Sequence, residues 1–347
     1  MPMQLDNTDK KLLNLLQTEV PVVPRPWLGV GEKLGGVSET EVMERVNALK
    51  TGHIVRQISA IFDTRSLGYK SSLVAVKCDP HKDDEVARVI NAHPGVSHNY
   101  RRNHAYNIWY TVAVAPNSKL GLDKTVQILH ETSGAITTRL MPTLHLFKIG
   151  VELDVEGTAK ADAKSEVRYS QKNRAADTTL TAREMLYIRE MQKDLAIESE
   201  PFVRIAERIG ISLKELQRIG GEMITAGKMR RFSAVLNHRR AGFTANGMGV
   251  WAVRGRTDEE FMRIGEKMAS FRAVSHCYKR PTYEDWPYNI FTMVHARTMA
   301  DCDAVLAEIS KETGITEYEA LYSTKEWKKT RVEYFTEAEK QWEAQHI

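Results

Sequence analysis

Residues 26–35, PWLGVGEKLG, return at residues 201–210 as PFVRIAERIG, and this repetition decides the fold. The two stretches share an apolar pattern, charged positions and a closing glycine. An S-x-x-E motif follows each of them, at Ser38 and at Ser212; in this motif the serine caps a helix amide and the glutamate reaches back. A helical apolar pattern comes next and ends at a glycine. Helix, short turn, capped helix and strand together predict a helix-turn-helix unit in each half.

The elements that follow each helix-turn-helix unit also occur twice. Strand-like runs and two amphipathic helices succeed one another in the order β, β, α, β, β, α, β, with residues 54–62 or 229–236 as the first strand. This order is close to a ferredoxin-like sandwich. We therefore predict an α+β protein, a tandem repeat of a helix-turn-helix unit followed by a ferredoxin-like α/β sandwich. The expected segments are helix-turn-helix 1–62, sandwich 63–155, linker 156–179, helix-turn-helix 180–237 and sandwich 238–347.

The linker between the copies is defined by its composition. Residues 156–179 are rich in Ala, Lys, Asp, Ser and Arg and have almost no apolar periodicity, which is typical of a solvated connection. Two sandwich domains joined in this way are expected to pair within the chain as a pseudo-twofold dimer. Assembly into a further homo-oligomer stays open.

The bulk composition excludes several classes of protein. With 347 residues, 42% hydrophobic and 27% charged, the chain is expected to be a globular protein of the cytoplasm. No apolar run approaches the ~20 residues of a membrane span, and Met1–Lys11 has no signal-peptide core. Cys78, Cys277 and Cys302 form no CxxC pair, so neither a disulfide framework nor a structural zinc is indicated. The net charge of +4 suits an anionic ligand but falls short of a dedicated nucleic-acid protein.

One polar strand motif occurs in both predicted sandwiches, as VSHNYRR at residues 96–102 and VSHCYKR at residues 274–280. Alternate residues of a strand share a face, so His98, Tyr100 and Arg102 point the same way. The second copy repeats this trio as His276, Tyr278 and Arg280. An ordinary core strand would carry Val, Ile or Leu at this period. The motif therefore predicts a functional face, although duplication also copies structural residues.

Two further features surround these strands. The second copy inserts PTYEDWP at residues 281–287, a stiff loop whose Tyr283 and Trp286 could cover a planar ligand or simply pack against each other in an exposed turn. Basic side chains also gather nearby, and the arginine fork binds carboxylates bidentately. The basic residues expected to bind substrate are Arg56, Arg101, Arg102, Arg231, Lys279 and Arg280.

The residues above resemble a known superfamily. Residues 5–17, the capped helix and the sandwich are similar to the feast/famine (Lrp/AsnC) transcription regulators, which implies that the sandwich is an AsnC-type ligand-binding domain. Within that superfamily, residues 97–102 and 275–281, with the segments that follow them, resemble the siroheme decarboxylases. These enzymes occur as two related subunits or as one fused chain. The resemblance implies conversion of two ring acetates of siroheme to methyl groups, with release of carbon dioxide, on a route to heme or heme d1.

The implied chemistry fits the predicted face. A pyrrole acetate loses carbon dioxide readily when the adjoining ring carbon is first protonated, which calls for a general acid and a dry site. We assign His98 and His276 as acids and Tyr100 and Tyr278 as orienting or relaying groups. A histidine that instead ligates the substrate iron stays an alternative. No metal site and no cofactor beyond siroheme is expected, because no G-x-G-x-x-G or other nucleotide motif follows a strand. Neither half is singled out as the working site.

Two other classes of function compete with this one. A DNA-binding regulator shares the scaffold, yet the first recognition helix opens with Glu39, Glu41 and Glu44, which phosphates repel. In the second copy the glycines at 220–221 interrupt the helix, so nucleic acid is not the expected partner. A tetrapyrrole-binding sensor without turnover would need the same arginines and histidines. Release of carbon dioxide from siroheme separates the sensor from the enzyme.

Overall fold

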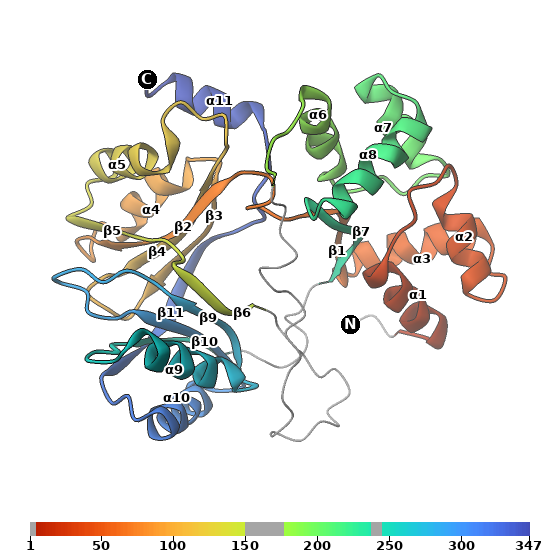
Figure 1. The fold of residues 1–347 in the computed structure, drawn as a ribbon. Helices are drawn as coiled ribbons and strands as arrows, with labels where there is room; N and C mark the ends of the chain where they lie inside the picture. The colour runs from red at the N-terminus through yellow and green to blue at the C-terminus, as the bar shows by residue number, and fades with distance from the viewer. Residues whose placement is uncertain (1–4, 150–176, 237–244) are drawn as a thin grey trace. The chain divides into compact units, whose positions relative to one another are not determined.

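The structure is a computed structural model that describes residues 5–149, 177–236 and 245–347. Its described residues form two compact units (Figure 1). The helix-turn-helix unit consists of residues 5–69, 177–236 and 333–337, and the sheet unit consists of the remainder. Most of the predicted linker lies outside the described residues, and the predicted domain boundaries stay predictions. No helix in the described ranges is long and apolar enough to cross a membrane.

The helix-turn-helix unit contains two copies of three helices and a strand. The first copy is α1 (Asn7–Thr18), α2 (Pro26–Lys33), α3 (Glu39–Thr51) and β1 (Val55–Phe62), and the second is α6 (Ala182–Met191), α7 (Pro201–Ile209), α8 (Leu213–Thr225) and β7 (Met229–Leu236). The predicted serine caps are present, because the Ser38 and Ser212 hydroxyls each accept an amide hydrogen bond at 3.2 Å. The glutamates do not reach back as predicted. Glu41 instead pairs with Arg45, and Glu215 pairs with Arg183.

Strands β1 and β7 form a sheet of their own. The predicted strand order counted them with the sandwiches, while the predicted segments 1–62 and 180–237 placed them with the helix-turn-helix units. They pair with each other antiparallel as a two-stranded sheet, with Ile58 opposite Ala234. Phe232 of β7 packs against Phe202 with ring centroids 5.1 Å apart, and its carbonyl accepts from Val20 N at 2.8 Å. The local pattern of a strand does not specify its partner, and here packing against the helices selects it.

The sheet unit is built around one nine-stranded sheet in the order β5-β2-β4-β3-β11-β8-β10-β9-β6. Helices α4 and α5 pack against strands of the first copy and α9 and α10 against strands of the second, so that the strands lie between the two pairs of helices (Figure 1). The first-copy elements are β2 (Lys70–Lys77), α4 (Asp83–Asn91), β3 (Val96–Arg102), β4 (Ile108–Val114), α5 (Gly121–Ser133), β5 (Thr137–Met141) and β6 (His145–Ile149). The second-copy elements are β8 (Ala245–Trp251), α9 (Asp258–Ser270), β9 (Val274–Lys279), β10 (Ile290–Ala296), α10 (Met299–Thr313) and β11 (Tyr318–Lys329), followed by α11 (Glu337–Ala344).

The last strands of the two copies are shared between them. In the first copy, β5 pairs with its own β2, whereas β6 pairs with β9 of the second copy. In the second copy, residues 318–322 of β11 pair with its own β8 and residues 323–329 pair with β3 of the first copy. This exchange makes one continuous sheet from two repeats, and it brings both polar strands into the same sheet.

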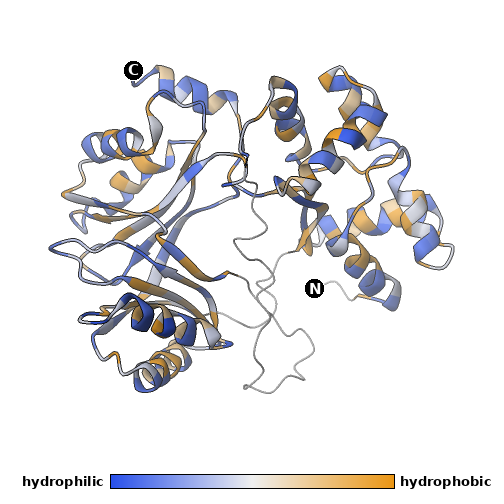
Figure 2. Ribbon diagram, viewed as in Figure 1, coloured by the Kyte–Doolittle hydropathy of each residue, from blue (hydrophilic) through white to orange (hydrophobic). Residues whose placement is uncertain are grey.

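The sheet unit has hydrophobic clusters on both sides of its strands. Two clusters lie under the helices, one for each copy, and Figure 2 shows the mixed hydrophobic and hydrophilic character of those helices. A third cluster lies on the face that the helices do not cover, here called the inner face. It combines first-copy Trp109 and Met141 with second-copy Val250, Phe291 and Leu321. The inner faces of the two copies therefore pack against each other.

Gly265 of α9 leaves room for the Phe147 side chain of β6, the first-copy strand that pairs with the second copy. A Cβ added there would lie 2.2 Å from the Phe147 ring of β6, closer than any real contact. We expect Gly265→Ala to lower the free energy of unfolding by roughly 1–3 kcal/mol through overpacking. The matched variant is Gly221→Ala in α8, where nothing lies within 4 Å, and it should be neutral or stabilising by up to ~1 kcal/mol. Urea unfolding measures both, and equal stability of the two variants would show that Phe147 is not seated against α9.

Candidate inner-face active site

The polar strands place their predicted trios on the inner face. Asn99, which follows His98, donates to Asn91 of α4 at 3.0 Å, so it faces the helices. His98 and Tyr100 therefore point to the opposite side, where Tyr100 stands opposite Trp109 in the register. In the second copy His276 pairs in register with Met293, while the intervening Cys277 lies in the cluster beneath the helices. The structure thus brings the two motifs onto equivalent faces of one sheet.

Each histidine is held in the same way. The Ser97 hydroxyl lies 3.0 Å from His98 Nδ1, and the Ser275 hydroxyl lies 2.8 Å from His276 Nδ1. Each imidazole also lies beside the tyrosine two residues later, with ring centroids 6.2 Å apart in the first copy and 6.0 Å apart in the second. The serine thus holds each ring through Nδ1. A hydrogen bond at one ring nitrogen fixes the orientation of an imidazole, which a proton donor or an iron ligand requires.

The two arginines that complete the trios are buried anchors. Arg102 Nη1 donates to the Leu321 carbonyl at 2.7 Å, and Arg280 Nη1 donates to the Met141 carbonyl. The Arg102 guanidinium thus ties β3 to its neighbour β11, whereas Arg280, which follows β9, reaches β5 of the first copy. Burial lowers the pKa of Arg102 to about 10, so it stays charged at neutral pH. Their predicted role in binding carboxylates stays a prediction.

Arg101 and Lys279 contact the helices rather than the inner face, and their assignment as substrate-binding residues stays a prediction. Arg101 forms an ion pair with Asp83 of α4, with Nε and Oδ2 3.0 Å apart. The Lys279 ammonium lies 4.4 Å from the centroid of the Phe261 ring in α9. Both side chains pack toward the helices because they alternate with the inner-face residues along their strands.

The inserted loop of the second copy, residues 281–287, packs against the first copy. Trp286 is 1% exposed, and its ring centroid lies 5.3 Å from that of Trp109 and 5.0 Å from that of Tyr288. The indole is thus enclosed by rings of both copies, and its predicted contact with a flat ligand stays a prediction. The Tyr283 hydroxyl donates to the Leu140 carbonyl of β5, which fastens the loop to the first copy.

Asp285 adds a second link between that loop and the first copy. It accepts from the Tyr106 hydroxyl at 2.6 Å and from both Nε and Nη2 of Arg139 at 3.0 Å. Burial, with the Asp285 hydrogen bond, raises the pKa of Tyr106 to about 12. The loop is thus held by a bidentate ion pair and two tyrosine hydroxyls.

Arg56 and Arg231, the remaining predicted substrate-binding residues, belong to the helix-turn-helix unit. Both are exposed, on β1 and β7 respectively, and Arg231 Nε donates to the Ser233 hydroxyl at 2.9 Å. Their assignment stays a prediction. Within the described residues, no group of three His, Cys, Asp or Glu side chains is arranged to hold a metal ion.

His295 is an inner-face residue that the sequence patterns did not single out. It lies on β10 two residues after Met293, the register partner of His276. Burial lowers the pKa of His295, and Lys329 lowers it further. A single histidine in an apolar strand does not by itself indicate a functional residue. An alignment of the two copies on their Tyr-Asn-Ile-aromatic motifs would have placed His295 at the position of Ala113 and so shown that the second copy alone has a histidine there.

Buried imidazoles make the stability of the protein depend on pH. Burial lowers the pKa of His93, and that of His276, to about 4. Each ring is therefore neutral in the folded state near pH 5 but largely protonated in the unfolded state, where its pKa is roughly 6.5. The unfolded state binds more protons in this window, so the free energy of unfolding falls as the pH falls from about 6.5 to 4.

Acidification to pH 5 should lower the free energy of unfolding by roughly 2 kcal/mol for each of these histidines. Urea unfolding at pH 7 and pH 5 measures the change. His93→Gln retains an acceptor for the Gly95 amide. It should remove the part of the pH dependence of the free energy of unfolding that His93 contributes. If the free energy of unfolding of this variant depended on pH as in the wild-type protein, the low pKa of His93 would be contradicted.

The fold and the inner face define a class of protein. It is a doubled ligand-binding domain of the AsnC type, with a helix-turn-helix unit, whose inner face carries repeated histidine and tyrosine side chains. Family models agree with this class. The AsnC-like ligand binding domain matches residues 66–148 and 240–328, and the siroheme decarboxylase NirDL-like HTH domain matches residues 9–56.

Individual relatives identify the family. The chain is 36% identical over 338 residues to the siroheme decarboxylase of Hydrogenobacter thermophilus, which covers 97% of this chain and 98% of that relative. It is 30% identical to the siroheme decarboxylase NirDL subunit of Paracoccus denitrificans, over 93% of this chain and 96% of the relative. A crystal structure of the siroheme decarboxylase NirDL superposes with a TM-score of 0.77 at 32% identity, covering 98% of each chain. The chain belongs to the siroheme decarboxylase family, in its fused single-chain form, as the resemblance predicted.

Proposed function

We propose that this protein converts two acetate side chains of siroheme to methyl groups and releases two molecules of carbon dioxide, as a carboxy-lyase of the cytoplasm. The observation that carries the proposal is the repeated histidine and tyrosine pair on the inner face, in a chain related to siroheme decarboxylases over 97% of its length. A related crystal structure holds an iron-uroporphyrin III analogue, at a TM-score of 0.76 and 31% identity, which supports a tetrapyrrole as the ligand.

The chain's own residues would supply acid and orientation. Protonation of the ring carbon beside an acetate lets the ring accept the electron pair of the breaking bond to carbon dioxide. An imidazole on the inner face is placed to donate that proton, and the neighbouring tyrosine to orient it. We infer no cofactor beyond the iron tetrapyrrole substrate. We also infer that the two sandwich copies act as a pseudo-dimer within one chain.

The low pKa of His276 decides when the acid forms. At about 4, this pKa makes the ring neutral at pH 7 in the unliganded protein. A substrate with several carboxylates brings negative charge beside the ring, and negative charge raises the pKa of a base. The acid would therefore form when substrate binds, with uptake of a proton. The neutral ring is also the form that ligates iron, so iron ligation by one histidine is compatible with the same geometry.

The regulator alternative is disfavoured by the helix-turn-helix unit. Glu39 of α3 is buried and paired with Arg25, and Gln217 of α8 donates to the Val22 carbonyl at 2.8 Å. Both helices that would read DNA thus use side chains from their N-terminal halves for internal contacts. A DNA complex whose affinity fell steeply with salt would revive this alternative.

The decisive experiment mixes purified protein with siroheme without oxygen. Carbon dioxide release and a product lacking two carboxylates are the expected results. Binding with unchanged substrate mass would replace the enzyme with a tetrapyrrole sensor. Failure to bind either siroheme or the iron-uroporphyrin III analogue would reject both readings.

A further inference from the structure

The asparagine of the Tyr-Asn-Ile-aromatic motif makes the same two side-chain hydrogen bonds in both copies. In the first copy, Asn107 Oδ1 accepts from Cys78 N at 3.0 Å and Asn107 Nδ2 donates to the Cys78 carbonyl at 3.2 Å. In the second copy, Asn289 Oδ1 accepts from Val253 N and Asn289 Nδ2 donates to the Val253 carbonyl, both at 3.0 Å. The carboxamide thus forms the two bonds that a residue of a paired strand forms. Each asparagine ties the start of β4 or β10 to the chain that leaves β2 or β8.

The backbone of the same asparagine closes the loop behind each polar motif. Arg102 N donates to the Asn107 carbonyl, and Arg280 N donates to the Asn289 carbonyl, both at 2.9 Å. The two loops differ in length, because the second carries the inserted PTYEDWP. The same closing pair in loops of unequal length indicates that the loop does not set this geometry. The asparagine sets it, because its side chain fastens it to the neighbouring chain.

In the second copy, the residue held by this asparagine contacts the inner face. The Arg280 side chain is buried, and its guanidinium lies 4.8 Å from the centroid of the Tyr278 ring and 5.2 Å from that of the Phe291 ring. These two rings are cross-strand partners in the register. A cation over the face of a ring is attracted to it, most strongly when both are desolvated. The guanidinium therefore restricts the position of Tyr278, whose ring lies beside that of His276.

Resting on the proposed function, we propose that Asn289 is a positioning residue of the decarboxylation, which acts through Arg280 on Tyr278. The asparagine fixes the backbone from which the arginine starts, and the arginine fixes the ring of the tyrosine. A displacement of about 1 Å among reacting groups can lower a rate roughly 10²-fold. A side chain that prevents such a displacement therefore contributes to the rate without handling a proton.

The test is a double-mutant cycle on Asn289→Ala and Arg280→Met, in single-turnover reactions on siroheme without oxygen. With protein in saturating excess, we expect each single variant to lower the rate constant of carbon dioxide release roughly 10²-fold. The double variant should be no more than about threefold slower than Arg280→Met, because the asparagine acts through the arginine. Independent effects would multiply to roughly 10⁴-fold, and that result would overturn the inference.

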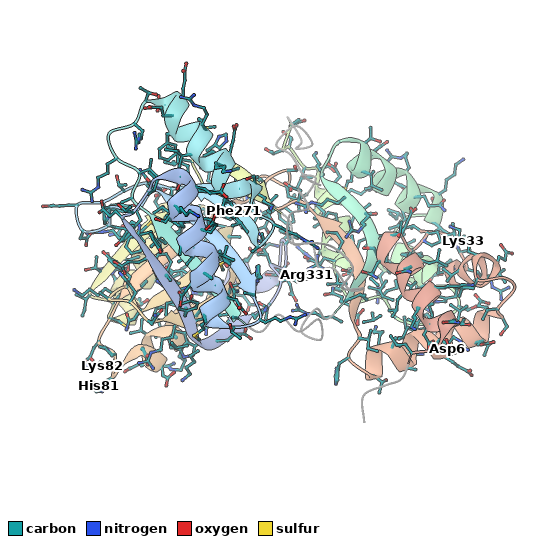
Figure 3. The ribbon with its side chains drawn as sticks, turned by 90° about the horizontal axis from the view of Figure 1, so that it is seen from below. Asp6, Lys33, His81, Lys82, Phe271 and Arg331 are labelled. Carbon is teal, nitrogen blue, oxygen red and sulfur yellow. The ribbon has the colours of Figure 1, made fainter. Side chains whose placement is uncertain are left out.

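The time course separates a loss of position from a loss of stability. A protein that is only destabilised reacts through its folded fraction, so its amplitude falls while its rate constant stays that of the wild type. Asn289→Ala should instead lower the rate constant. Gly265→Ala, which crowds the Phe147 ring, is the destabilised control and should keep the wild-type rate constant. His81→Ala, at the exposed position labelled in Figure 3, is the surface control and should react at the wild-type rate.

The outcomes separate this inference from the proposed function. A wild-type protein that releases no carbon dioxide would reject the function itself, and the inference with it. An active wild-type protein with Asn289→Ala within threefold of its rate constant, or reduced in amplitude alone, would overturn the inference alone. Near-ultraviolet circular dichroism checks that the variants remain folded. If Asn289→Ala does not fold, Asn289→Asp, which keeps an acceptor for Val253 N, takes its place in the same cycle.

Discussion

His276→Ala is expected to lower the rate of carbon dioxide release by roughly 10²- to 10⁴-fold, the range typical of a lost general acid. His276 is held by the Ser275 hydroxyl and stands opposite Ile149 of β6, so bulk water does not readily replace its proton. Single-turnover release of carbon dioxide from siroheme, with the mass of the product, measures the effect. Binding of the iron-uroporphyrin III analogue should weaken far less than the rate.

His98→Ala is the comparison variant in the other copy. It removes the same imidazole from the same serine contact, but beside Lys329 and Glu326. We expect a fall in rate of less than about tenfold and a larger effect on substrate affinity, since Lys329, which stands opposite His98 in the register, attracts carboxylates. If His98→Ala lost the greater part of the turnover and His276→Ala did not, the assignment of the reacting site would have to be reversed.

Trp286→Ala should have the largest effect on stability. The indole is 1% exposed and packs against aromatic rings from both copies. Removing a buried tryptophan side chain typically lowers the free energy of unfolding by about 3–5 kcal/mol, because transfer free energy is lost and a cavity remains. Urea unfolding followed by circular dichroism measures this change.

Trp286→Phe distinguishes packing from hydrogen bonding at the same position. The Nε1 hydrogen of Trp286 is buried without a partner among the described residues, so its removal should cost nothing in hydrogen bonds. Phenylalanine keeps a ring in the cluster and should lose much less stability than alanine. Equal losses in the two variants would mean that the N–H makes a contact that the fold relies on.

The loop around Trp286 shows why the sequence alone left its packing undecided. Two aromatic residues and two prolines in seven residues fit a ligand cover and a packed brace equally well. The choice was made by residues far away in the chain, because Asp285 is held by Tyr106 and Arg139, and Tyr283 by the Leu140 carbonyl. No local pattern contains these partners.

The sequence alone determined the features that depend on local periodicity and on repetition. The paired helix-turn-helix units, the serine caps and the side of the strand taken by His98 and His276 follow from periods of 3.6 and 2 and from short motifs. The family also followed from the repeated strand motifs. Tertiary structure decided the rest: that β1 pairs with β7, that β6 and β11 cross between copies, and that His295 lies on the same face of the sheet as His276. Strand pairing is a contact between distant segments, and its energy comes from the surfaces that meet rather than from either strand by itself.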